Sequence, residues 1–415
     1  MVRDISNHPC FNPEVKQKIG RIHLPVAPKC NVQCNFCNRL FDCVNESRPG
    51  VTSAVLSPNQ ALYYLKQMYE RDNRLSVVGI AGPGDTFANP DESLETMSLI
   101  REAFPDMLLC VSTNGLAAPD YIDKLAEIGI THLTVTVNAV DAAIGSKIYS
   151  WIRDNKKIYR GKEAIEILMQ RQFETIQKCH EKSIVVKINS IAIPTINDNH
   201  IVDIAKKVSE LGADLFNCIP MLPVEGTAFQ SIGPLKKEDL ELIRQECKKY
   251  IPQMLHCTRC RADAVGCLGD KIPKSSIKLL QTVAAGPLNP KENRPNVAVA
   301  SHEGLLVNEH LGRAKYLWIY TPDGDGYKLL ETRQTPPGGG DIRWRQLSGI
   351  LRDCKAILVA AAGQKPTEVL YRYGVKVIVA EAMIEQVLKS VDNAEELEKY
   401  KPRQARCCSG GAGCA

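Results

Sequence analysis

Apolar and polar positions follow two alternating patterns between residue 57 and about residue 250. Short runs that are apolar at nearly every position are separated by longer stretches in which apolar positions recur with the period of a helix. Ser57 and Pro58 mark one helix start, with Ser57 as the predicted N-cap. Buried strands that alternate with amphipathic helices are typical of a parallel sheet. The predicted strands are 75–82, 107–113, 132–138, 184–193 and 214–220, and the predicted helices include 57–71, 121–129 and 199–212.

The same alternation predicts an α/β fold whose first domain, residues 1–267, contains a partial β/α (TIM-like) barrel. In such a barrel, chemistry is expected where the C-terminal ends of the parallel strands meet. Residues 268–295 are punctuated by Pro, Lys and Asn, which predicts a linker. A second alternating pattern predicts a small α/β domain over 296–392, and the charged and then Gly-rich end predicts a flexible tail over 393–415. The strands predicted in the small domain are 296–301, 315–321, 326–334, 356–361 and 375–380, with helices near 342–353, 366–374 and 383–391.

Composition and charge narrow the classes of function. The chain has 415 residues, of which 44% are hydrophobic and 24% charged, as in an ordinary globular protein. A formal net charge of +5 is small for this length and gives no reason to expect binding to nucleic acid or to an anionic membrane. The N-terminus has no apolar signal segment, and no apolar run is long enough to span a membrane. We therefore expect a cytoplasmic protein without nucleic-acid or membrane partners.

The cysteine content of the chain points to metal chemistry. Sixteen cysteines in a cytoplasmic chain favour metal or cluster ligation over disulfide bonds, because the cytosol keeps thiols reduced. Some cysteines are expected to be small buried hydrophobes instead, because they stand in predicted strands or helices without ligand-like neighbours. These are Cys179, Cys218, Cys247 and Cys354.

Three cysteines stand together in the run CNVQCNFC, namely Cys30, Cys34 and Cys37. Their thiolates can cap three irons of a 4Fe-4S cube and leave the last iron open to an exogenous ligand. The alternative is a zinc loop, which needs another protein ligand nearby. The spacing CX3CX2C, with the aromatic Phe36 before the last Cys, resembles the signature of radical S-adenosylmethionine (SAM) enzymes. In that family SAM occupies the open iron, and an electron from the cluster cleaves it to a 5′-deoxyadenosyl radical.

The ends of the predicted strands agree with this resemblance. The run IAGPGDTFANP resembles the family's Gly-rich segment that binds the SAM amino group, and Gly82, Gly84 and Asp85 match it. Glycines allow the backbone to approach a ligand closely. Polar residues at later strand ends are further candidates for the SAM-facing rim, although Asn and Gly at a strand end are also ordinary turn formers. These candidates are Ser112, Thr113, Asn114 and Asn138.

The first domain holds more soft ligands than one cluster needs. Cys10, His23 and Cys43 flank the cysteine loop, and Cys110 lies in or at the end of a predicted strand. A CX2C pair follows the last predicted barrel helix, and its spacing allows both cysteines to bind one metal centre. The pair is Cys257 and Cys260, with Cys267 in the same run.

Five motifs, dispersed over residues 8–270, together resemble the NifB family of nitrogenase cofactor maturases. They are HPCFNPE, HLPVAPKCNVQCNFCNR, FDCVNESRPG, AGPGDTFANP and HCTRCRADAVGCLGD. The resemblance implies a lyase- or transferase-like radical SAM enzyme that fuses two 4Fe-4S clusters, inserts a carbide derived from a SAM methyl group and adds a sulfur. The implied product is NifB-co, the 8Fe-9S-C precursor of the nitrogenase iron-molybdenum cofactor. The implied partners are SAM, iron-sulfur cluster donors, an electron donor and downstream carriers or scaffolds of the cofactor.

The resemblance also implies three groups of ligands for three 4Fe-4S clusters. The first group holds the SAM cluster and consists of Cys30, Cys34 and Cys37. The other two groups hold the substrate clusters, and each leaves an open iron. One consists of His23, Cys43 and Cys110, the other of Cys10, Cys257 and Cys260. The alternatives are an ordinary structural role for His23 and a zinc site at the CX2C pair.

Two charged residues after Cys43 are implied to sit near the SAM cavity. These are Glu46 and Arg48, with Glu46 a proton acceptor for the methyl carbon as it becomes carbide. The alternative is a capped turn with a surface ion pair, which contributes little to stability.

Residues 296–390 resemble the cofactor-binding domain of the NifX and NafY type, a ribonuclease H-like α/β fold. The stretch VAVASHEGLLVNEHLGRAKYLWIY carries the resemblance and offers His302 and His310 as cluster contacts, with the role of holding or handing over the product. That family often has Phe after the second His, where this chain has Leu311. The alternative for His310 is a structural role, which is common for a histidine in a loop before a strand. In the tail, Cys407, Cys408 and Cys414 could escort iron or clusters. The alternative is a disordered thiol tail with no fixed geometry.

Two other functions are compatible with the sequence. One is an iron-sulfur scaffold or carrier without SAM chemistry. The other is a generic radical SAM enzyme whose extra clusters relay electrons. Reductive cleavage of SAM separates the first from an enzyme, and conversion of the bound clusters separates the second from a maturase.

Overall fold

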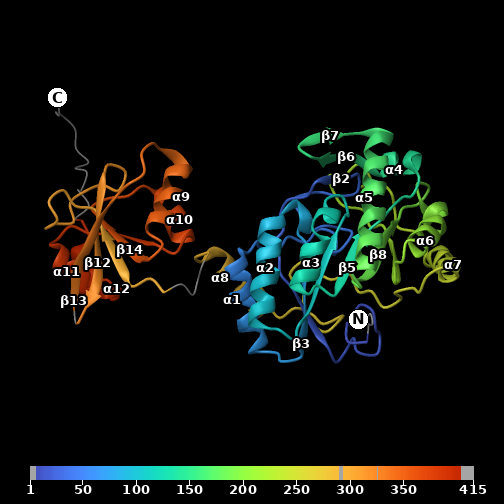
Figure 1. Cartoon of the computed structure of the whole chain (residues 1–415), viewed down its shortest axis with the longest axis horizontal. Coiled ribbons are helices and arrows are strands. Elements are labelled where there is room, and N and C mark those ends of the chain that lie inside the picture. The colour runs from blue at the N-terminus through green and yellow to red at the C-terminus, as the bar shows by residue number, and fades with distance from the viewer. Residues whose placement is uncertain (1–5, 289–292, 325, 403–415) are drawn as a thin grey trace, which may run out of the picture. The chain divides into compact units, whose positions relative to one another are not determined.

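The computed structural model of the chain describes residues 6–288, 293–324 and 326–402. It divides into two compact units, Met1–Ala284 and Ala285–Ala415, which are described separately below (Figure 1). Cys407, Cys408 and Cys414 lie outside the described residues.

The first unit is built on a curved sheet with the strand order β10-β1-β3-β4-β5-β8-β9. All neighbouring pairs are parallel except β10 with β1. A mostly parallel sheet needs helical crossovers, as the alternating sequence pattern predicts. The strands are β1 (Gly20–His23), β3 (Leu75–Ile80), β4 (Leu108–Thr113), β5 (His132–Thr136), β8 (Val185–Ala192), β9 (Leu215–Pro220) and β10 (Val265–Gly266).

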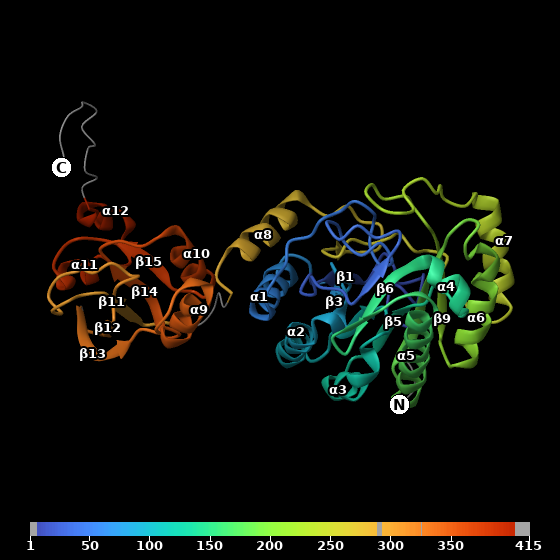
Figure 2. The ribbon, with the colours of Figure 1, turned by 90° about the horizontal axis from the view of Figure 1, so that it is seen from above.

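Helices cover the outer face of this sheet in an arc (Figure 2). They are α1 (Pro58–Tyr69), α2 (Pro90–Ala103), α3 (Ile122–Ile128), α5 (Gly161–Glu181), α6 (Ile201–Glu210), α7 (Lys237–Lys248) and α8 (Lys274–Ala285). Helix α4 (Ala142–Ile148) packs against α5 and β6 instead. The predicted N-cap of α1 is confirmed: Ser57 Oγ accepts from the Gln60 N–H at 3.2 Å, and Gln60 Oε1 accepts from the Ser57 N–H at 3.0 Å. The α/β partial barrel predicted from the sequence is confirmed.

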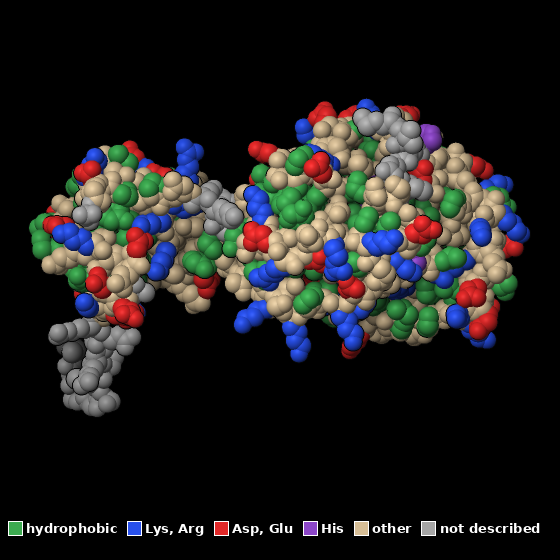
Figure 3. All heavy atoms as spheres, turned by 90° about the horizontal axis from the view of Figure 1, so that it is seen from below, with side chains coloured by type: hydrophobic (Ala, Val, Ile, Leu, Met, Phe, Trp, Pro, Cys, Tyr) green, Lys and Arg blue, Asp and Glu red, His purple; other side chains and the backbone are tan. Residues whose placement is uncertain are grey.

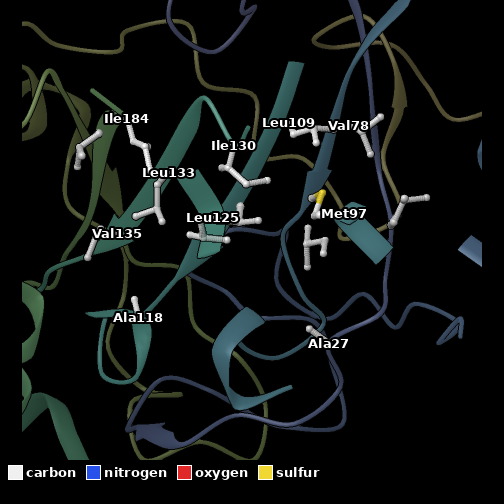
Figure 4. Packing of buried hydrophobic residues seen from close by; sticks show 14 of the residues in the cluster. Ala27, Val78, Met97, Leu109, Ala118, Leu125, Ile130, Leu133, Val135 and Ile184 are labelled. Carbon is white, nitrogen blue, oxygen red and sulfur yellow. The ribbon is translucent and has the colours of Figure 1, made fainter. Parts of the chain in front are cut away.

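The hydrophobic core of the first unit lies between the sheet and these helices. Val78, Leu109 and Leu133 project from the strands and are completely buried with Met97 of α2 and Leu125 of α3 (Figure 4). Each fully buried aliphatic side chain contributes roughly 1.5–3 kcal/mol to stability. The fold is therefore held by the outer face of the strands.

The inner face of the same strands is polar. Successive strand residues point to opposite faces, and the register aligns Gly79 with Cys110 and Cys110 with His132. Residues at such alternate positions line one cavity inside the curved sheet. From the strands these are Arg21, His23, Val77, Gly79, Cys110, Ser112, His132, Thr134, Lys187, Asn189, Asn217 and Ile219.

Helix α8 occupies part of the span predicted as a linker, residues 268–295. Its Leu280 and Val283 belong to the core of the first unit, and Gln60 Nε2 donates to the Val283 carbonyl at 2.8 Å. The Pro and Lys residues around α8 hid its apolar stripe in the sequence pattern.

A small antiparallel sheet of β2 (Val32–Cys34), β6 (Tyr149–Asp154) and β7 (Lys157–Tyr159) carries part of the cysteine loop. Cys34 pairs with Tyr149 in this sheet. The sequence pattern did not predict these strands, because each is short and mixes polar with apolar residues.

The second unit is a mixed five-stranded sheet in the order β13-β12-β11-β14-β15, with helices packed against it. Its strands are β11 (Asn296–Val299), β12 (Tyr316–Asp323), β13 (Gly326–Gln334), β14 (Cys354–Val359) and β15 (Lys376–Val379). Its helices are α9 (Gly340–Ile350), α10 (Gln364–Arg372), α11 (Ile384–Lys389) and α12 (Ala394–Leu397). Every strand and helix predicted for this unit is present.

Candidate active site

The cysteine loop follows β1, and its shape is fixed by residues other than its thiols. Arg39 donates to the carbonyl oxygens of Cys30 at 2.9 Å and Val32 at 2.6 Å, and its guanidinium lies 5.2 Å from the ring centre of Trp151. Gln33 Nε2 donates to the carbonyls of Cys34 at 3.1 Å and Cys37 at 2.9 Å. These contacts hold the backbone of the loop independently of its thiols, of which Cys30 Sγ donates to the Val32 carbonyl at 3.3 Å.

Burial disfavours the thiolate form of these cysteines in the metal-free chain. It raises the pKa of Cys30 to about 12 and raises the pKa of Cys34 and Cys37 as well. Thiolates are nevertheless the ligands of iron-sulfur clusters, so binding must release the thiol protons. Such a loop suits a bound cluster better than a free, reactive thiol.

The Gly-rich segment after β3 lies directly beside the backbone that leads into Cys30. The Gly84 N–H donates to the Ala27 carbonyl at 2.6 Å, and the Asp85 N–H donates to the Lys29 carbonyl at 2.8 Å. A Cβ atom on Gly84 would lie 2.1 Å from the Lys29 carbonyl oxygen. Gly82 has a φ of +127°, a conformation that glycine adopts without strain. Steric constraints thus explain why glycine stands at both positions.

Asp85 connects this segment to the end of β4. Its Oδ1 accepts from the Phe87 N–H at 3.0 Å, and its Oδ2 accepts from the Asn114 N–H at 2.6 Å and from Thr113 Oγ1 at 3.1 Å. Burial raises the pKa of Asp85, while these hydrogen bonds oppose the rise. In the structure this carboxylate holds two loops together.

The other rim residues differ in what they face. Asn114 Nδ2 lies 3.7 Å from Cys30 Sγ and donates to Asn31 Oδ1 at 2.7 Å, so it borders the cysteine loop. The Ser112 hydroxyl hydrogen-bonds to the Glu46 carboxylate. Asn138 is completely buried, and its Oδ1 accepts from the Ile191 N–H of β8 at 2.8 Å. Asn138 therefore joins two strands.

Glu46 and Arg48 point in different directions. Glu46 lines the cavity and accepts from Asn189 Nδ2 at 3.0 Å and from Thr136 Oγ1 at 3.3 Å. Removal from water raises the pKa of Glu46, and Lys187 opposes the rise. Arg48 is exposed and donates through Nε to the Arg259 carbonyl at 2.8 Å. Arg48 thus supports the segment that carries the CX2C pair.

Soft ligands from distant parts of the chain line the same cavity. The N-terminal segment and the segment after α7 meet there, because His256 Nε2 lies 3.0 Å from the Pro9 carbonyl. Arg21 Nη2 lies 3.0 Å from Cys260 Sγ. Within the described residues, no three Cys, His, Asp or Glu side chains converge as ligands of a single metal ion would. The soft ligands of this cavity are Cys10, His23, Cys110, Cys257 and Cys260.

His23 is set up as a neutral ligand. Its Nδ1 lies 3.0 Å from the Arg261 carbonyl oxygen. A carbonyl only accepts, so Nδ1 carries the proton and Nε2 presents its lone pair. Burial, followed by the charge of Arg21, lowers the pKa of His23 to about 3, which keeps the ring neutral near pH 7. This tautomer fits cluster ligation through Nε2.

Gly79 provides the space in which His23 and Cys110 approach each other. A Cβ atom on Gly79 would lie 2.9 Å from Cys110 Sγ, 3.1 Å from His23 Cδ2 and 3.5 Å from His23 Nε2. Both ligands therefore face one point that a side chain would fill. The two side chains are therefore close enough to contact one common group.

We expect Gly79→Ala to displace the side chains of Cys110 and His23, at a cost of about 1–3 kcal/mol in stability. Iron bound after anaerobic reconstitution should fall by about four atoms per chain while SAM cleavage persists. The control is Gly233→Ala, because a Cβ there meets no atom within 4 Å. Full iron content in Gly79→Ala would contradict this expectation.

Cys43 lies apart from the two residues with which the sequence resemblance grouped it. It borders a neighbouring cavity together with Cys30 and Cys37. Asn45 Nδ2 lies 3.5 Å from Cys43 Sγ and 3.9 Å from Cys34 Sγ. In this structure Cys43 is thus next to the thiols of the cysteine loop, and Asn45 bridges them.

Sequence reasoning missed several residues of the site. For those that lie in strands, the signal is a polar residue at every second position of an otherwise apolar strand, as in HLTVT of β5 and VVKINS of β8. The ring centroids of His8 and His132 are 4.5 Å apart on the wall of the cavity. The missed residues are His8, Arg21, Arg39, Asn45, His132, Lys187 and Asn189.

The histidines predicted as cluster contacts in the second unit have different environments. His302 is exposed, and its Nδ1 lies 3.8 Å from Glu309 Oε1 at the edge of a cavity that Trp318 also lines. His310 Nδ1 accepts from the Gly312 N–H at 2.9 Å. Leu311, where the family often has Phe, is completely buried in the core.

The surface of the described residues carries charges of both signs. Basic and acidic side chains are interspersed over the face of the first unit in Figure 3. None of the helices in the described part of the chain combines the length and apolar character that a membrane span requires.

Residues 24–208 match the Radical SAM superfamily, and residues 294–394 match the family described as Dinitrogenase iron-molybdenum cofactor. The chain is 46% identical over 417 residues to the FeMo cofactor biosynthesis protein NifB of Chlorobaculum tepidum, covering 100% of this chain and 98% of that relative. It is 38% identical over 402 residues to the NifB protein of Klebsiella pneumoniae, covering 89% and 86%. It is also similar to the solved structure of methylornithine synthase, with 12% identity, a TM-score of 0.39 and coverage of 64% and 82%.

Proposed function

Because the chain belongs to the NifB family of FeMo cofactor biosynthesis proteins and contains a radical SAM domain, we propose that it makes NifB-co. In this reaction two 4Fe-4S clusters are fused with a SAM-derived carbide and an added sulfur. One observation supports the proposal above all. Soft ligands from the N-terminal segment, from β1 and β4 and from the segment after α7 line one cavity beside the cysteine loop.

Cys30, Cys34 and Cys37 would hold the SAM cluster, which with SAM supplies an electron and the 5′-deoxyadenosyl radical when both are bound. Gly82, Gly84 and Asp85 would shape the SAM site, because they fix the β3 loop against the backbone of the cysteine loop. Ser112, Thr113 and Asn114 continue this rim at the end of β4.

The substrate clusters would be held by the remaining ligands. Cys10, Cys257 and Cys260 would hold one cube; His23 and Cys110 would hold the other, with Cys43 as the last ligand of that group. The neutral His23 supports this assignment, since an imidazole must be unprotonated to bind metal. Three protein ligands per cube leave an iron free, which suits a cluster that is later released.

Glu46 would accept protons from the methyl carbon as it becomes carbide. Its carboxylate lies in the cavity and is held by Asn189 and Thr136. Its raised pKa supports this role, because a more basic carboxylate accepts a proton more readily. Arg48 would position the CX2C segment through the Arg259 carbonyl.

This reaction requires specific partner proteins. We expect iron-sulfur cluster donors, an electron donor and downstream carriers or scaffolds of the cofactor, all in the cytoplasm. The second unit would hold or hand over the product through His302 and His310. The match of residues 294–394 supports this role.

Anaerobic reconstitution tests the proposal. The full chain should bind about twelve irons, cleave SAM when reduced, and retain label from the SAM methyl group in the iron-containing product. If SAM stays intact after reduction, the only function that remains compatible is that of a scaffold or carrier. If SAM is cleaved but its methyl label is not transferred, the compatible function is that of a radical SAM enzyme whose extra clusters relay electrons.

A further inference from the structure

Lys187 is a cation inside the barrel that the reaction described above does not use. It lies in β8, is only 8% exposed and lines the cavity of the soft ligands. Its strand neighbours in register are Thr134 of β5 and Leu215 of β9. Lysine is among the residues least often buried without a partner, so its position needs an explanation.

Titratable groups from both proposed substrate sites line the cavity together with Lys187. Cys10 and Cys257 belong to one group, Cys110 to the other, and together with Glu46 they raise the pKa of Lys187 against the opposite effect of burial. Lys187 therefore keeps its positive charge. The same charge acts on His8 and His23.

The second cation of the cavity, Arg21, differs from Lys187 in its partners. Arg21 donates to the Cys267 carbonyl at 2.7 Å, to the Gly266 carbonyl and to Cys260 Sγ. Among the residues that the structure describes, none accepts a hydrogen bond from the Lys187 ammonium. An ammonium at such a position is stabilised by a nearby anion, which a group bound in the cavity would supply.

The proposed substrates are such anions. In the reduced state each cube with its thiolate ligands carries net negative charge, and two such anions held in one cavity away from bulk water repel each other. A cation close to ligands of both groups lowers this repulsion. Arg21 is already engaged by the Gly266 and Cys267 carbonyls and by Cys260, whereas Lys187 makes no such hydrogen bond within the described residues and lines the cavity with Cys10, Cys110 and Cys257.

We propose that Lys187 is a positioning residue that offsets the negative charge of the two substrate clusters, so that both are held in one cavity. The inference rests on the proposed function, since it presupposes two substrate clusters.

The test compares Lys187→Met with Lys187→Arg in the full chain, reconstituted anaerobically. Lys187→Met should lose about four of the irons that exceed the SAM cluster, whereas Lys187→Arg should keep them. The midpoint potential of the substrate cluster that remains in Lys187→Met, measured by electron paramagnetic resonance, should become more negative, because a lost cation destabilises the reduced state. SAM cleavage should persist in both variants. Lys206→Met, which removes an exposed charge on α6, is the control.

Full iron content with an unchanged potential in Lys187→Met would overturn the inference, as would equal losses in the Met and Arg variants. If Lys187→Met does not fold, Lys187→Gln is assessed by the same measurements. An unsubstituted chain that binds only about four irons would overturn the proposed function itself, and this inference with it, before any variant is compared.

Discussion

Cys34→Ala is expected to abolish reductive cleavage of SAM while the substrate clusters stay bound. The SAM cluster would lose one of its three thiolate ligands, so cleavage should fall at least about 1000-fold and iron by about four atoms per chain. Cys34 lies in β2 and pairs with Tyr149 through the backbone, which a change to alanine leaves intact. The measurement is 5′-deoxyadenosine formed under reductant, together with iron content.

A buried cysteine outside the cavity is the matched control for this experiment. Cys218 of β9 is 1% exposed and belongs to the hydrophobic layer between sheet and helices. Cys218→Ala should cost about 1 kcal/mol in stability but leave SAM cleavage unchanged. If Cys34→Ala still cleaved SAM, or if Cys218→Ala lost as much activity, Cys34 would not be a ligand of the SAM cluster.

The second large effect is expected for Gly84→Ala. The added Cβ would lie 2.1 Å from the Lys29 carbonyl oxygen and 2.8 Å from that of Pro28, so backbone must move. Overpacking of this kind costs about 3 kcal/mol or more. The hydrogen bonds from Gly84 N–H and Asp85 N–H that hold the cysteine loop would be strained or lost. Both stability and binding of the SAM cluster should therefore fall.

Urea unfolding under anaerobic conditions measures the first effect of Gly84→Ala, and iron content measures the second. Gly233→Ala serves again as the control, because its Cβ would stand in open space. A Gly84→Ala chain as stable as the control would show that the β3 loop can move away from Lys29 at little cost.

The sequence pattern predicted well those strands and helices that bury one face or are buried completely. Strands β3, β4, β8 and β9 are apolar at most positions and β5 at alternate positions, because helices cover their outer face. The strands β2, β6 and β7 were missed, because three- to six-residue strands with mixed polarity carry no clear period. Helix α8 was missed because its stripe is short and lies among Pro and Lys residues.

The candidate site could be predicted in part, because soft ligands are recognisable from residue type alone. The radical SAM assignment is confirmed, whereas the grouping of the ligands stays a prediction. Lys187 and Arg21 were missed, since a polar residue within an apolar strand does not reveal which face it occupies. The position of Cys43 depends on the path of its loop, which residue type and spacing do not fix.

The division of the barrel strands into an apolar outer face and a polar inner face has a consequence for turnover. The residues that keep the chain folded, such as Val78 and Leu133, do not line the cavity that would hold the substrate clusters. The barrel would therefore stay folded when the finished cluster leaves, and it could then bind the next two 4Fe-4S clusters. A barrel whose stability does not depend on bound clusters could release its product and bind new clusters many times.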